Sequence, residues 1–231
     1  MINKIYKEEF RQKVYHQKLK DLEADNLELY AHEKQLPDDN IQAKFFAFFF
    51  AIFQQLTGIN VIVLYGGELA EGFFPSLKQE LPIFIQIEKL IVASMGVWLL
   101  KCYGRRYLTQ IGLVLIFISL IGLTSGFWMN EDVQWSKNLI FASFFVYIIA
   151  FVVTYGPIMW LYIPEIVQPN FVPYVITCHW TTCCTVITLF PIVRSACGDL
   201  NCPWIFLFFT VCVGVCMLVV HKMMVETKDK P

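Results

Sequence analysis

Six apolar stretches follow one another along the chain from residue 44 onward, separated by short polar or Pro- and Gly-containing connections. They cover residues 44–66, 81–101, 107–129, 138–163, 173–194 and 203–222. A helix needs about 20 mostly apolar residues to cross the roughly 30 Å hydrocarbon core of a bilayer. The pattern therefore predicts an all-α integral membrane protein with six transmembrane helices.

The first 43 residues have a different pattern, with charged residues of both signs throughout. Apolar side chains such as Ile5, Phe10, Val14 and Leu22 recur at roughly helical spacing, which predicts amphipathic helices in a cytosolic arm. A solvated charged linker accounts equally well for its first 30 residues. The sequence thus divides into an arm (1–43), a six-span body (44–222) and a short cytosolic tail (223–231).

Composition supports the membrane assignment, because charged residues make up 16% of the chain against about 25% in a soluble domain. The net charge of −1 gives no argument for binding nucleic acid. Cys197 and Cys202 flank a short polar connection and are candidates for a disulfide if that connection lies outside the cytosol.

Lys and Arg counts predict the orientation of the spans. With the arm in the cytosol, six basic residues fall on the cytosolic side of the body and three on the other side. The cytosolic set is Lys101, Arg105, Arg106, Lys222, Lys228 and Lys230, and the opposite set is Lys78, Lys137 and Arg194. Both termini are therefore expected in the cytosol. The membrane that holds the protein is expected to be the plasma membrane or a vacuolar or other organelle membrane.

Three amides lie in the middle of the first span, at Gln54, Gln55 and Asn60. Polar side chains inside a membrane are costly unless they face a partner or a water-filled cavity. Amides both donate and accept hydrogen bonds, which suits ligands rich in hydroxyl groups. The alternative is that they join neighbouring helices, but three amides together favour a shared cavity.

The fourth span contains Tyr155-Gly156-Pro157, a sequence that interrupts the helical hydrogen-bond ladder, and Trp160 follows one turn later. Interrupted helices near the membrane centre are where transporters build binding sites and gates. The indole of Trp160 could stack on a sugar ring, or it could be an aromatic residue of the membrane interface.

Together these motifs resemble one protein family. Gln54-Gln55-Leu56-Thr57-Gly58-Ile59-Asn60, the basic turn Gly104-Arg105-Arg106, the Gly-Pro, Trp and Glu165 of the fourth span, and Glu226-Thr227-Lys228 after the sixth resemble the C-terminal half of a sugar porter of the major facilitator superfamily. The resemblance covers about residues 42–228. It implies half of a major facilitator fold, with the arm as the connection between two six-span halves.

The resemblance implies roles for individual residues. The residues that would bind a monosaccharide are Gln54, Gln55, Asn60, Tyr65, Trp160, His179 and Trp180. Tyr65 would close the site from outside, and His179 stands where the family usually has a polar amide. Arg105, Arg106, Glu165 and Glu226 would form an inner charge network that locks the two halves. A proton is a candidate coupling ion.

Two departures from the family pattern bear on the site. Glu88 and Lys89 lie in the second span, where a charge costs about 2.5–3.5 kcal/mol, so one of them is expected to face the cavity. The chain also has six predicted spans where the family has twelve. It is interpreted as part of a twelve-span sugar carrier, as a half-size transporter acting through a partner chain, or as a non-transporting sensor or regulator. No enzyme motif, metal-ligand pattern or cofactor-binding loop occurs in the sequence.

Overall fold

A computed structural model describes residues 17–18, 20–24, 40–70, 81–129, 134–196 and 203–228. The chain divides into two compact units, Met1–Ile41 and Gln42–Pro231. In the first unit residues 17–18 and 20–24 are helical, and Gln17 donates a hydrogen bond to Asp21 one turn later. The rest of the predicted arm lies outside the described residues, as do Cys197 and Cys202.

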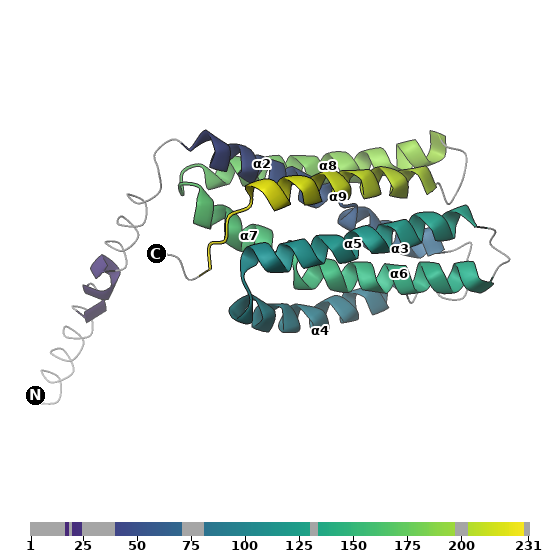
Figure 1. Cartoon of the computed structure of the whole chain (residues 1–231), viewed down its shortest axis with the longest axis horizontal. Helices are drawn as coiled ribbons and strands as arrows, with labels where there is room; N and C mark the ends of the chain where they lie inside the picture. Colours follow the sequence, from purple (N-terminus) through teal and green to yellow (C-terminus); the bar gives the residue numbers. More distant parts are fainter. Residues whose placement is uncertain are drawn as a thin grey trace, which may run out of the picture. The chain divides into compact units, whose positions relative to one another are not determined.

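The second unit is built from helices alone within the described residues, which confirms the all-α prediction. The helices run along one another as a bundle (Figure 1). They are α2 (Ile41–Gln55), α3 (Ile59–Ala70), α4 (Leu81–Cys102), α5 (Arg105–Trp128), α6 (Gln134–Val153), α7 (Tyr155–Ile166), α8 (Val172–Ala196) and α9 (Pro203–Met223).

Five segments of the described residues are long and apolar enough to cross a membrane. They are Ile41–Gly66, Arg105–Trp128, Gln134–Ile166, Val172–Ala196 and Pro203–Met223. The other predicted span, 81–101, forms the 22-residue helix α4, which is not among these five. The second of the six predicted spans, residues 81–101, therefore stays a prediction.

The first predicted span is not one continuous helix, because α2 ends at Gln55 and α3 begins at Ile59. Gly58 lies in the break with a φ of 86°, a conformation that L side chains rarely adopt. A Cβ at this position would also lie 2.6 Å from Cδ2 of Phe209 in α9. Only glycine meets both the backbone and the packing requirement here.

The fourth predicted span is also interrupted, at Thr154, two residues before the predicted break at Gly156-Pro157. Pro157 falls in the first turn of α7, where its missing N–H is tolerated. In a continuous helix its ring would clash with the carbonyl of Val153. The chain turns out of the helical path at Thr154 (φ −120°, ψ −89°) before that clash arises.

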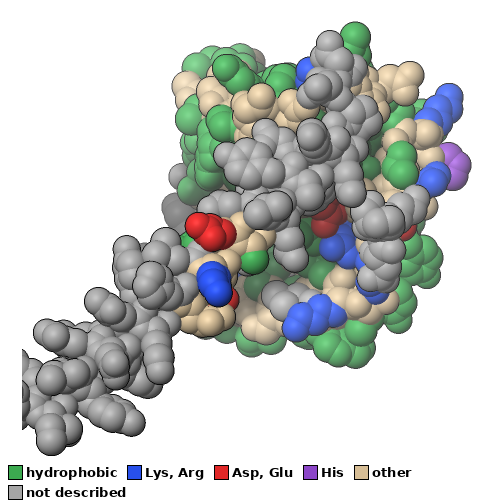
Figure 2. Space-filling view, turned by 90° about the vertical axis from the view of Figure 1, so that its left-hand side faces the viewer, with side chains coloured by type: hydrophobic (Ala, Val, Ile, Leu, Met, Phe, Trp, Pro, Cys, Tyr) green, Lys and Arg blue, Asp and Glu red, His purple; other side chains and the backbone are tan. Residues whose placement is uncertain are grey.

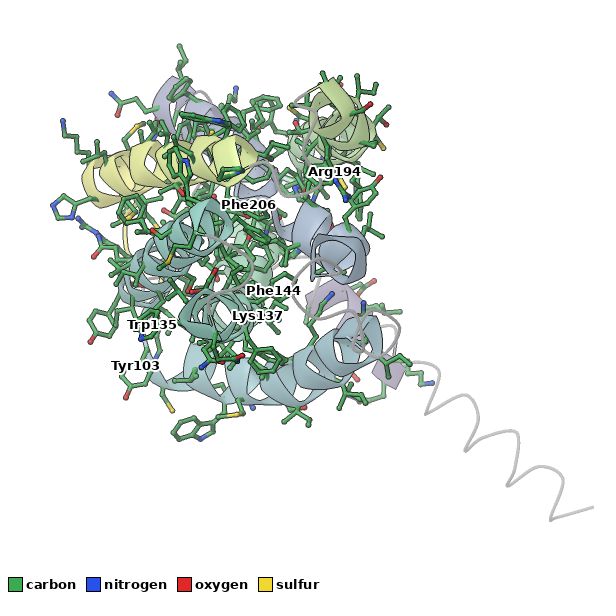
Figure 3. All side chains as sticks on the ribbon, turned by 90° about the vertical axis from the view of Figure 1, so that its right-hand side faces the viewer. Tyr103, Trp135, Lys137, Phe144, Arg194 and Phe206 are labelled. Atoms are coloured by element: carbon green, nitrogen blue, oxygen red, sulfur yellow. The ribbon has the colours of Figure 1, made fainter. Side chains whose placement is uncertain are left out.

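Helix α5 lies at the centre of the bundle and packs on α6, α7 and α9. Its glycines Gly112, Gly122 and Gly126 meet side chains of α6 and of the α6–α7 break so closely that a Cβ would overlap them. Close contact through small residues is the usual basis of helix association in membranes. Further along, the labelled Phe206 and Phe144 point into the bundle (Figure 3), and both are buried.

Gly58→Ala should lower the thermal stability of the purified protein. The left-handed backbone costs about 1–2 kcal/mol for a residue with a Cβ, and the methyl group overlaps Phe209 as well. Gly214→Ala is the matched control, because a Cβ there would make an ordinary 3.4 Å contact with Phe117. Thermal unfolding in detergent, followed by size-exclusion chromatography, measures both. Equal midpoints for the two variants would contradict the account of Gly58.

Candidate functional site

The two helix breaks lie against each other, and Gln54 joins them. Its Nε2 donates to the backbone oxygens of Tyr155 (3.3 Å) and Gly156 (3.1 Å) in the first turn of α7. The phenol of Tyr147 in α6 donates to the oxygen of Thr57 in the first break, at 2.9 Å. Gln54 is only 3% exposed. This amide therefore ties two interrupted helices together rather than facing open space.

Gln55, the next residue, points toward α8 instead. Its Nε2 lies 2.9 Å from Nε2 of His179, and its Oε1 accepts a hydrogen bond from Nδ2 of Asn60 at 2.5 Å. Nδ1 of His179 lies 3.2 Å from the backbone oxygen of Ala51. Gln55 and His179 are buried, whereas Asn60 is half-buried. The three predicted residues thus form one hydrogen-bonded chain across α2, α3 and α8.

Two exposed indoles flank the hydrogen-bonded residues Gln55, Asn60 and His179. The ring of Trp160 in α7 lies 5.2 Å from the His179 ring, and the ring of Trp180 in α8 lies 5.3 Å from it, both edge to face. The two indoles are 6.3 Å apart. Trp160 is 44% and Trp180 is 53% exposed. The hydrogen-bonded group is therefore flanked by two indoles that both have exposed surface.

Of the other predicted sugar-site residues, Tyr65 and Lys89 have described side chains, and neither is hydrogen-bonded to this cluster. Tyr65 is on α3, where its hydroxyl donates to the backbone oxygen of Ile187 at 3.4 Å and its ring packs on Phe190. Lys89 is half-buried on α4, and the side chain of Glu88 lies outside the described residues. Among the described residues, no hydrogen bond joins the Lys89 side chain to the cluster.

The sequence interpretation did not include Cys183. Its Sγ lies 3.2 Å from Nδ2 of Asn60, and it is 5% exposed. Cys183 stands four residues after His179 on α8, so both lie on the same helix face. That spacing was a signal in the sequence, but the apolar surroundings favoured a packing role for the cysteine.

The four residues of the predicted charge network do gather, at the end of the bundle where α4 meets α5, here called the GRR end. The Arg105 guanidinium forms a 3.0 Å ion pair with Glu165. Lys, Arg, Asp and Glu side chains are visible together on this face of the molecule (Figure 2). Arg106 donates to the backbone oxygen of His221 at 2.8 Å.

Glu226 binds backbone N–H groups. Its carboxylate accepts hydrogen bonds from the backbone N–H groups of Arg105 (2.8 Å) and Arg106 (3.1 Å), at the start of α5. It also accepts from the N–H groups of Thr227 and Lys228. Burial raises the pKa of Glu226, but these four N–H donors outweigh burial and hold the pKa below its ordinary value.

The segment after α9 is fastened at further points. Tyr162 of α7 exchanges two hydrogen bonds with the backbone of Val225, at 2.9 and 3.1 Å. The Thr227 hydroxyl donates to Glu165, and Nζ of Lys228 donates to the backbone oxygen of Lys101. These bonds link α4, α5, α7 and the end of α9.

Comparison with known proteins places the chain in a family. The sequence model of the family described as "Sugar (and other) transporter" matches residues 4–231. The chain is 27% identical over 193 residues to solute carrier family 2, facilitated glucose transporter member 2, of Gallus gallus, covering 82% of this chain and 36% of that protein. It is 26% identical over 187 residues to the facilitated trehalose transporter Tret1 of Anopheles gambiae, covering 77% and 23%.

Solved structures show the same fold. The chain superposes on a double Trp mutant of XylE with a TM-score of 0.77 at 19% identity, covering 91% of this chain and 47% of that one. It superposes on the inward open xylose transporter XylE from E. coli with a TM-score of 0.69 at 20% identity, covering 90% and 44%. The chain thus spans less than half the length of each of these four relatives. Because the family match extends over residues 4–231, the chain belongs to the sugar (and other) transporter family.

Proposed function

We propose that this chain forms one wall of a sugar path in a carrier that works by alternating access, with a second six-span half as the other wall. The observation that carries the proposal is the half-buried Asn60 beside the exposed Trp160 and Trp180. An amide can exchange hydrogen bonds with sugar hydroxyls, and an indole face can pack on the apolar face of a sugar ring. The proposed substrate is a hexose-like monosaccharide, with a proton as coupling ion.

The geometry favours different roles for the predicted sugar-binding residues. Asn60, Trp160 and Trp180 have accessible surface and are proposed to contact the sugar. Gln55 and His179 stand behind them and orient Asn60. Gln54 holds the two breaks together. Tyr65 is proposed to close the path further along α3.

The GRR end is proposed to face the cytosol, because basic residues concentrate there. Lys101, Arg105 and Arg106 lie where α4 meets α5, and Lys222 and Lys228 follow at the end of α9. At the other end of the bundle, Lys137 and Arg194 are the basic residues of the described part (Figure 3). Both termini would then be cytosolic.

The charged contacts of the GRR end are proposed to lock the bundle in one state of the transport cycle. The Arg105–Glu165 ion pair and the Glu226 contacts with the start of α5 join three helices. Opening the path at this end would require these contacts to break. Their strength would therefore set the balance between the two states.

Uptake of labelled glucose tests the proposed function, in hexose-transport-deficient cells that express this chain together with an N-terminal six-span half. Asn60→Ala and Trp160→Ala should lower uptake about tenfold or more, as expected when a polar or stacking contact with the substrate is lost. The amount of protein in the membrane should stay the same. Gln54→Ala should instead lower that amount, because it unties the two breaks.

Trp135→Ala is the matched control, since Trp135 is an exposed tryptophan at the end of the bundle opposite the GRR end (Figure 3). It should leave uptake unchanged. Normal uptake by the Asn60 and Trp160 variants would place the sugar site elsewhere. Glucose binding with no uptake, with or without the N-terminal half, would favour the sensor interpretation over the carrier.

Glu226 should make stability depend on pH in the acid range. Its folded-state pKa lies below its unfolded-state value, so its stabilising contribution is present above the ordinary carboxyl range and is lost as pH falls through the folded-state pKa. Glu226→Gln should therefore unfold at a lower temperature than the unsubstituted chain at neutral pH. The difference should shrink toward zero in strong acid. A constant difference across pH would contradict this account.

A further inference from the structure

The ring of His179 has two partners whose hydrogen-bonding character is fixed. The backbone oxygen of Ala51 can only accept, so Nδ1, at 3.2 Å from it, carries a hydrogen. The amide nitrogen of Gln55 can only donate, and it lies 2.9 Å from Nε2 and 3.4 Å from Nδ1 of His179. Because Nδ1 donates to Ala51, the nearer nitrogen, Nε2, must accept. The arrangement therefore selects one neutral tautomer of the imidazole.

This tautomer sets which group donates and which accepts in the hydrogen bonds that join His179, Gln55 and Asn60. Gln55 turns its nitrogen to His179 and consequently its oxygen to Asn60, which donates from Nδ2 at 2.5 Å. The same Nδ2 also faces Sγ of Cys183 at 3.2 Å. Since Asn60 uses its nitrogen on the protein side, its oxygen is the group left for a ligand. The half-buried Asn60 thus presents a hydrogen-bond acceptor.

Within the described part of the chain, the groups in contact with the His179 ring are uncharged. They are the backbone of Ala51 and the amide of Gln55 from α2, the indole of Trp160 from α7, and the indole of Trp180 from α8. The titratable group next along α8, Cys183, is bonded to Asn60. A change in the charge of His179 would therefore act first on the orientation of the Gln55 amide.

We propose that His179 is a proton-binding site, and that one proton on its Nε2 reverses the hydrogen-bond chain and changes which group Asn60 offers to the substrate. This inference rests on the proposed function and names the coupling group within the site. The proton adds to the Nε2 lone pair, so both ring nitrogens then donate. Gln55 turns its oxygen to the ring and its nitrogen to Asn60.

Asn60 must then turn as well, because its own nitrogen would face the Gln55 nitrogen. Its oxygen accepts from Gln55 and from the Cys183 thiol, which donates in place of accepting. The Asn60 nitrogen becomes the group that faces the ligand. Each hydrogen bond between these four side chains is kept in both states. The group that Asn60 offers to the ligand changes from an acceptor to a donor.

Deoxyfluoro sugars distinguish the two states, because fluorine cannot donate a hydrogen bond. Binding of D-glucose and of each monodeoxyfluoro-D-glucose is measured on this chain purified together with an N-terminal six-span half, at about pH 8 and about pH 5, the range over which histidine titrates. At one ring position the fluoro substitution should weaken binding about tenfold at the higher pH, the loss expected for one unmade hydrogen bond. At the lower pH this penalty should fall several-fold.

His179→Asn and His179→Gln should show the same fluoro penalty at both pH values, because an amide takes up no proton in this range. His221→Asn, a change at an exposed histidine at the end of α9, should behave as the unsubstituted chain. A fluoro penalty in the unsubstituted chain that is equal at both pH values, at every ring position, would overturn the proposal.

Tryptophan fluorescence reports the proton without any sugar. Trp160 and Trp180 lie within the roughly 6 Å over which a cation interacts with an indole. The unsubstituted chain should show a fluorescence titration between about pH 8 and about pH 5 that both His179 variants lose. Absence of this titration would also overturn the proposal. A titration that depends on His179, with no glucose binding at any pH, would contradict the proposed function alone.

Discussion

Backbone polar groups inside a hydrocarbon core need partners within the protein, and this need governs how the two interrupted helices of this chain sit together. Tyr147 supplies a donor to the oxygen of Thr57 in the first break, and Gln54 supplies donors to the first turn after the second break. Each break is thus held by a side chain from the other span or its neighbour. Because Gln54 is fixed against α7, Gln55, about 100° further round α2, is directed toward α8 and His179.

Apolar runs and mid-span amides are local signals, so the sequence could predict five of the apolar segments and the closeness of Gln55 and Asn60. The different fates of Gln54 and Gln55 could not be predicted, because they depend on which helix lies on each side of α2. The left-handed Gly58 was hidden for a related reason. The packing requirement at Gly58 comes from Phe209, about 150 positions away in the sequence, which leaves no room for a Cβ. The break at Thr154 was displaced from the predicted Gly-Pro because proline disturbs the turn that precedes it.

The GRR end shows a similar limit. The four charged residues lie together at this end, and Glu165 pairs with the Arg105 side chain. Glu226 instead occupies the N-terminus of α5, where free N–H groups favour an anion. Gly104 permits this, since a Cβ there would overlap the Glu226 carboxylate. Arg106 is then available to bind the oxygen of His221 and hold the end of α9.

Histidine in place of an amide at position 179 changes what the site can do. An asparagine or glutamine there could satisfy Gln55 in either orientation without any change in charge. An imidazole links that orientation to a proton, because its second nitrogen is already committed to Ala51. The proton would then be bound in the same wall that contacts the sugar, one hydrogen bond from Gln55 and two from Asn60. In this arrangement a proton would change the group offered to the sugar through the rotation of two amides, with no movement of helices.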